Sequence, residues 1–186
     1  MRIDFKKIEK DLMESKIILF TLGSKYYPEF STHLLKFMLS KPSWKCIYVG
    51  VVKPYVDVKK NLEKNKVDTK RIYFIDCISR TVAEEIEEKP GVAFLLPADL
   101  TGLAIAIDEA INKLGEKDFK VFLFFDTLST FLIYSSAPTL ARFSHFITGR
   151  IRLKNLKGII LTLEEQVDKA FFASIKSFCD KVIEIK

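Results

Sequence analysis

Cysteine is scarce in this 186-residue sequence, and its placement argues against two classes of protein. Cys46, Cys77 and Cys179 are odd in number and far apart, so they do not form a disulfide framework. The sequence also lacks a CxxC pair and a cysteine–histidine cluster of the kind that binds zinc. We therefore expect reduced thiols that are buried as small apolar side chains.

Long apolar runs are also missing, since none approaches the roughly 18–20 residues that a transmembrane helix needs. The charged first residues are not followed by the apolar core and cleavage site of a secretory signal. Apolar residues make up 48% and charged residues 29%, as in globular proteins. Abundant lysine and glutamate with a single glutamine are typical of thermophilic proteins. We expect one cytoplasmic domain spanning residues 1–186, with no membrane contact.

Acidic residues are absent from the long stretch between Thr127 and Leu163. That stretch nevertheless carries a basic cluster made of Arg142, Arg150, Arg152, Lys154 and Lys157. Such a cluster could neutralise phosphates of a nucleic acid. A solvated basic helix face in a lysine-rich protein is the simpler explanation, and both interpretations stay open.

Apolar strands alternate regularly with amphipathic helices along the chain. Short apolar runs predict strands at 16–21, 46–52, 71–75, 92–96, 121–125, 158–163 and 181–185. Helical spacing of apolar residues predicts helices at 31–40, from Pro54 onward, and at 103–114, 138–153 and 167–178, with Asp99 as an N-cap. This order predicts an α/β protein with three α/β/α layers and a mostly parallel central sheet.

Ligands of open parallel sheets bind beyond the carboxyl ends of the strands. Asp126 follows the wholly apolar strand 121–125, where a carboxylate could hold a hydrated Mg²⁺. The hydroxyls of the following Thr-Leu-Ser stand beside it. The alternative is that Asp126 caps the turn after its strand, as aspartate often does.

Several segments resemble the RecA/KaiC-like family of P-loop ATPases, in its archaeal form. FFDTLST at 124–130 resembles the Walker B strand, and PADLT at 97–101 resembles the segment before it. GIILT at 158–162 and DKVIEI at 180–185 are similar to the next and the closing strands. The resemblance covers residues 16–185 and implies a RecA-like P-loop NTPase core that assembles side by side and takes ATP and Mg²⁺.

The phosphate loop departs from that family's GxxxxGK[ST] pattern, in which glycines shape the loop and a lysine reaches the phosphates. Residues 23–32 read GSKYYPEFST, so Ser31 and Thr32 stand at the hydroxyl positions and Phe30 stands in the place of the lysine. Pro28 removes an amide donor and Glu29 would repel a triphosphate. The family's glutamate after the second strand is also missing, since 51–53 read VVK. Both losses remove electrostatic catalysis.

We therefore expect a non-catalytic RecA/KaiC-like module with a degenerate Walker A motif and no ATP hydrolysis. It would act through binding, as a regulatory or scaffolding protein, and would require no cofactor. Its partner would be another protein or a second copy of the chain. The apolar stretch TFLIY at 130–134 is a candidate interface, unless it begins a buried helix.

Two alternatives stay open. One is a nucleic-acid-binding RecA paralogue that uses Arg142, Arg150, Arg152 and Lys154. The other is an ATPase with a non-standard phosphate loop, in which Asp126 also holds Mg²⁺ and the nucleotide-binding residues are Gly23, Ser24, Lys25, Ser31, Thr32, Asp126 and Thr127. Nucleotide binding survives if the amides of 23–32 can wrap an anion, and fails if Tyr26, Tyr27 or Phe30 fills the cleft.

Overall fold

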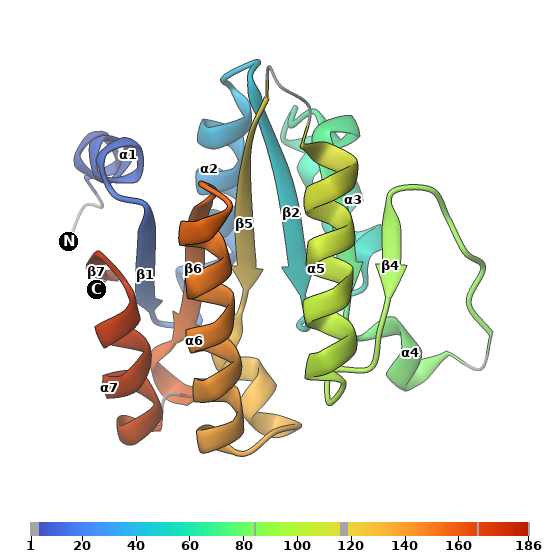
Figure 1. The fold of residues 1–186 in the computed structure, drawn as a ribbon. Helices are drawn as coiled ribbons and strands as arrows, with labels where there is room; N and C mark the ends of the chain where they lie inside the picture. The colour runs from blue at the N-terminus through green and yellow to red at the C-terminus, as the bar shows by residue number, and fades with distance from the viewer. Residues whose placement is uncertain (1–3, 84, 116–118, 167, 186) are drawn as a thin grey trace.

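A computed structural model describes residues 4–83, 85–115, 119–166 and 168–185. Its strands form one sheet in the order β4-β3-β2-β5-β6-β1-β7, and every neighbouring pair is parallel (Figure 1). The strands are β1 (Ile17–Leu22), β2 (Trp44–Gly50), β3 (Ile72–Asp76), β4 (Val92–Phe94), β5 (Lys120–Asp126), β6 (Lys157–Leu163) and β7 (Lys181–Ile185). The parallel sheet predicted from the alternating pattern is thereby confirmed.

Helices cover both faces of this sheet. One face carries α1 (Phe5–Glu14), α2 (Tyr27–Leu39) and α3 (Tyr55–Lys64), and the other carries α5 (Leu100–Leu114), α6 (Ala137–Leu153) and α7 (Lys169–Phe178). The short α4 (Ser79–Val82) and the 3-10 turns η1 (Thr69–Arg71), η2 (Leu128–Ile133) and η3 (Glu164–Gln166) lie in the connections. None of the described helices is long and apolar enough to cross a membrane. The three-layer α/β/α architecture is confirmed.

Each face of the sheet buries its own apolar core because successive strand residues point to opposite sides. Ile18 and Phe20 of β1 face α1 and α2, whereas Ile17 and Leu19 face the layer of α6 and α7. In the first core, the ring of Phe30 packs edge-on against Phe20, with 5.1 Å between ring centroids. The position where the family has its lysine therefore belongs to the core of this protein.

Helix α1 was not predicted from the sequence. The Asp4 side chain accepts a hydrogen bond from the Lys7 amide and caps its N-terminus, and Ile8 and Leu12 are buried against the sheet. At its C-terminus, the Lys157 ammonium of β6 donates to the carbonyls of Leu12 and Ser15. A buried lysine thus satisfies carbonyls that a helix end leaves without partners.

Strand β4 is short and pairs with β3 only along Phe74–Asp76. Gly91, just before β4, has a φ of 80°, a conformation that favours glycine, and Pro90 has no amide hydrogen to donate. Pairing therefore begins only at Val92, which leaves the first part of β3 open at the edge of the sheet.

Candidate functional site: a closed crevice at the carboxyl ends of the strands

Asp126 ends β5, in the middle of the sheet and in register with Gly50 of β2. Its side chain is only 3% exposed. One carboxylate oxygen, Oδ2, accepts a short hydrogen bond from the Tyr48 hydroxyl, while Oδ1 has no hydrogen-bond partner among the described residues. Burial raises the pKa of Asp126 to about 6, against the lowering effects of the two nearby tyrosines and of Lys53.

Tyr27, in the first turn of α2, faces the same carboxylate and is nearly buried. Burial, and then the negative charge of Asp126, raise the pKa of the Tyr27 hydroxyl well above its ordinary value. Burial and the same charge raise the pKa of Tyr48. Two neutral tyrosines therefore occupy the space beside Asp126.

The predicted phosphate loop is a tight turn in the structure. The Tyr26 amide donates to the Gly23 carbonyl, and α2 begins at Tyr27 rather than near Ser31. The Ser24 amide donates to Oε1 of Glu165 in η3 at 3.0 Å, and this hydrogen bond lowers the pKa of Glu165. A carboxylate of the same chain thus takes an amide that would otherwise be free to bind an anion.

The hydroxyls of Ser31 and Thr32 are turned back onto their own helix. Both donate to the Pro28 carbonyl, at 3.4 Å and 2.8 Å, and the Asn61 side chain of α3 donates to Thr32 at 3.1 Å. Lys25 lies outside the crevice, with its ammonium 5.8 Å from the centre of the Tyr26 ring.

The hydroxyls after Asp126 join the ends of β5 and β6. Thr127 is fully buried, and its hydroxyl lies 2.6 Å from that of Thr130. The Ser129 hydroxyl accepts a hydrogen bond from the Leu163 amide at 3.0 Å. The peptide bond between Asp126 and Thr127 is cis. These hydroxyls hold the turn and do not face a ligand position beside Asp126.

Asp76, at the end of β3, has a different role from Asp126. Its carboxylate accepts hydrogen bonds from the amides of Tyr55, Ile78 and Ser79 and from the Ser79 hydroxyl. Each of its two oxygens has a partner. Asp76 therefore caps the turn after β3.

A pocket of about 170 Å³ lies between α2 and α3, at the ends of β2 and β5. It brings together Ser31, Thr32 and Asp126 of the sequence prediction, but not Gly23, Ser24, Lys25 or Thr127. Tyr27, named from the sequence as a side chain that could fill the cleft, also lines the pocket, whereas Tyr48, Asp57 and Asn61 were not singled out. Tyr48 could have been noticed in the sequence, because its hydroxyl is a polar group within the apolar part of β2.

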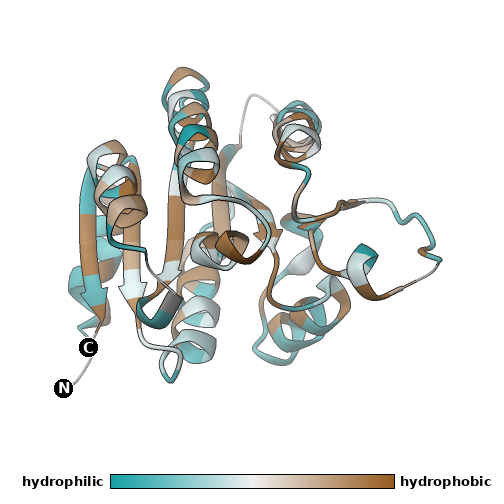
Figure 2. Cartoon of the chain, turned by 90° about the horizontal axis from the view of Figure 1, so that it is seen from below, coloured by the Kyte–Doolittle hydropathy of each residue, from teal (hydrophilic) through white to brown (hydrophobic). Residues whose placement is uncertain are grey.

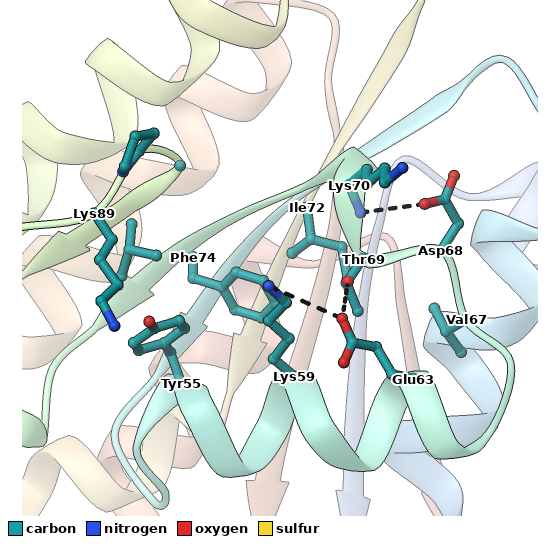
Figure 3. Close-up of a pocket in the computed structure, with 13 residues that line it drawn as sticks. Tyr55, Lys59, Glu63, Val67, Asp68, Thr69, Lys70, Ile72, Phe74 and Lys89 are labelled. Carbon is teal, nitrogen blue, oxygen red and sulfur yellow. Dashed lines mark hydrogen bonds and ion pairs between the residues drawn. The ribbon is translucent and has the colours of Figure 1, made fainter.

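A second, more open hollow of about 500 Å³ lies beside the sheet edge that β4 leaves uncovered (Figure 3). Lys59 and Glu63 project into it from α3, with 3.9 Å between ammonium and carboxylate, and Glu63 also accepts from the Thr69 hydroxyl at 2.9 Å. Lys89 lies near Tyr55 and pairs with Glu87 at 3.5 Å. These groups have partners within the chain, so this hollow is the weaker candidate.

The basic residues of α6 are partly neutralised. Arg150 pairs with Asp108 of α5 at 2.5 Å, and Arg152 pairs with Asp180 at 2.6 Å and donates to the Phe178 carbonyl. Arg142 donates to the Thr139 hydroxyl, and Lys154 is the C-cap residue of α6. Two of the four predicted phosphate contacts are therefore engaged with carboxylates.

Metal ligation finds little support at the crevice. In the described ranges, His, Cys, Asp and Glu side chains nowhere gather in threes as a metal site would require. Mg²⁺ takes free oxygen ligands in near-octahedral geometry. Asp126 is buried against two tyrosines, and the Ser31 and Thr32 hydroxyls donate to a carbonyl. Among these groups, only Asp126 could offer a carboxylate oxygen to a hydrated Mg²⁺, and that carboxylate is buried.

The fold places the chain in a known structural class. It is similar to the crystal structure of a KaiC-like protein from the hyperthermophilic archaeon Pyrococcus horikoshii OT3, with a TM-score of 0.65 and 9% sequence identity. The match covers 92% of this chain and 72% of the other. At such low identity the likeness shows the fold alone, which is the α/β fold of that KaiC-like protein.

Within that class, the chain belongs to DUF7504, a family of unknown function that matches residues 51–185. No curated protein matches the chain in sequence.

Proposed function

We propose that this protein is a non-catalytic RecA/KaiC-like module that acts through binding, as a regulatory or scaffolding component, and does not hydrolyse ATP. The observation that carries the proposal is the closure of the crevice by Tyr27 and Tyr48, which flank the carboxylate at the end of β5. Both side chains stand where a nucleotide and its metal would have to reach Asp126.

The charges around the crevice support the same conclusion. Phosphoryl transfer depends on cations and amides placed around the transferred group. Phe30 is buried in the core, Ser24 already donates its amide to Glu165, and Lys53 stands where the family has a water-activating glutamate. Neither the phosphate nor the attacking water would find its usual stabilising groups.

Titration with millimolar Mg·ATP in a calorimeter, together with a phosphate-release assay, tests the proposal. We expect no saturable heat and no phosphate release above the buffer rate. A Tyr27→Ala/Glu165→Ala variant opens the crevice and removes the acceptor of the Ser24 amide, so it serves as the matched comparison for weak anion binding. Saturable Mg·ATP binding by the wild-type protein, abolished in Asp126→Ala, would instead support the ATPase alternative.

The binding surface that we propose is the exposed part of η2 at the carboxyl end of the sheet. Phe131 is buried, whereas Ile133 is 67% and Tyr134 is 37% exposed. Figure 2 looks onto this end of the molecule, where η2 carries hydrophobic colour beside the strand ends. Thr130 and Phe131 thus belong to the core, and the side chains of Ile133 and Tyr134 are available to a protein partner or a second copy.

A further inference from the structure

The pocket between α2 and α3 has the size of a small molecule. Its volume of about 170 Å³ is close to that of an engineered cavity of about 150 Å³ that holds benzene. Drug-sized ligands and nucleotides occupy pockets of roughly 300 Å³ or more. Leu35, Val58 and Leu62 provide its apolar wall. A ligand of this pocket therefore has only a few carbon atoms.

At the polar end of the pocket, the Asp126 carboxylate accepts a hydrogen bond from Tyr48 at Oδ2, and the Tyr27 hydroxyl also faces it. Oδ1 of Asp126 is buried and has no hydrogen-bond partner in the described part of the chain. Such groups are uncommon, because an unsatisfied buried polar atom loses its hydration without compensation. Asp76, equally buried at the end of β3, has partners for both oxygens. The protein thus provides hydrogen bonds to both oxygens of Asp76, whereas Oδ1 of Asp126 has none among the described residues.

The charge of the lining favours a positive ligand. Two aspartates, Asp57 and Asp126, and one lysine, Lys53, contribute the charged groups. With both carboxylates ionised, the lining carries a net charge of −1, the difference between one positive and two negative groups. An opposite charge close to a buried carboxylate stabilises its ionised form.

We infer that this pocket binds a small primary amine in its protonated form, with the ammonium group donating a hydrogen bond to Oδ1 of Asp126. A slender ammonium suits the narrow access to a carboxylate that is 3% exposed, and a short alkyl chain suits the apolar wall. The inference goes beyond the proposed function and does not depend on it, because the amine contacts Asp126 whereas an ATP phosphate would need the 23–26 turn.

Titration of the protein with n-propylammonium chloride tests the inference, followed by the aromatic ring signals of Tyr27 and Tyr48 in a ¹³C–¹H NMR spectrum. Sodium chloride keeps the ionic strength constant. We expect saturable shifts of both rings with millimolar affinity. The neutral 1-propanol and the anionic propionate, which have nearly the same size, should bind at least tenfold more weakly.

The Asp126→Asn variant should weaken n-propylammonium binding at least tenfold, because it removes the charge and keeps the shape. Asp57→Asn is the matched control at the exposed carboxylate and should change the affinity by less. Lowering the pH through about 6 should weaken binding in the wild-type protein, as Asp126 takes up a proton. Equal binding of propanol and propylammonium, or absence of saturable shifts with propylammonium, would overturn the inference.

Discussion

Asp126 is a carboxylate whose ionised form is destabilised by burial at the crevice. An ionised carboxylate is costly to bury unless hydrogen bonds and positive charge compensate it. Tyr48, Tyr27 and Lys53 compensate Asp126 in part, while Oδ1 has no hydrogen-bond partner among the described residues. Its pKa of about 6 in the folded protein, above the ordinary value of 3.8, measures that cost. A group whose pKa rises on folding stabilises the protein below its unfolded pKa and loses that contribution as the pH rises through its folded pKa.

The Asp126→Asn variant should therefore be more stable than the wild-type protein at neutral pH. A shift of about two pKa units corresponds to at most about 3 kcal/mol in the free energy of unfolding. The advantage should be nearly absent at about pH 4 and should grow as the pH rises to about 7. Urea unfolding at both pH values measures it, with Asp57→Asn as the exposed control. A variant less stable than wild type at neutral pH would show that the ionised carboxylate is well compensated.

At the same scale, the sequence named Tyr27 as a side chain that could fill the cleft, but it could not supply the contacts that close the crevice. Tyr27 meets Asp126, and Ser24 meets Glu165, only because distant segments fold together. Phe30 could be recognised as a replacement for the family's lysine, but its packing against Phe5 depends on helix α1, which was not predicted. Asp126 and Asp76 were predictable, since each ends an apolar strand.

Among the elements, strands were predicted better than helix beginnings. Each predicted strand overlaps an observed one, because an apolar run bounded by polar residues is a local signal. Helix α2 starts four residues earlier than 31, since Pro28 is well suited to a first turn. Helix α1 escaped notice although Asp4, Phe5, Ile8 and Leu12 have the spacing of a capped amphipathic helix. Its apolar face is short, and its C-terminal cap comes from the distant Lys157.

That cap can be tested by a Lys157→Met variant, which keeps the aliphatic stem and removes the ammonium. The carbonyls of Leu12 and Ser15 would lose their donor, and we expect a loss of about 1–3 kcal/mol in the free energy of unfolding. Hydrogen exchange of the last α1 amides should accelerate more than exchange in α2. Denaturant unfolding and exchange by mass spectrometry measure both effects.

Lys10→Met is the matched control for this element. The Lys10 ammonium pairs with Glu14 of α1 at 3.7 Å and both side chains are well exposed, so its removal should cost less than about 1 kcal/mol. Equal losses in the two variants would mean that α1 is held by its ion pair as much as by its cap.

On the scale of the whole molecule, the sheet joins the two ends of the described chain. Strand β1 lies between β6 and β7, so the first strand is completed only by the last two. The cores on the two faces of the sheet share all the central strands. This arrangement supports our proposal that residues 1–186 form a single domain with a RecA/KaiC-like core, whose binding surfaces lie at the carboxyl ends of the strands.

Assembly through the exposed end of η2 is the remaining prediction at this scale. Ile133 and Tyr134 present apolar surface beside buried residues that fix their position, which favours association over local rearrangement. We expect the wild-type protein to show a concentration-dependent increase in mass by size exclusion with light scattering, and Ile133→Ser to abolish it without loss of stability. Ile105→Ser removes a similarly exposed side chain from α5 and should leave the association unchanged. A wild-type protein that stays monomeric at high concentration would contradict self-association through η2.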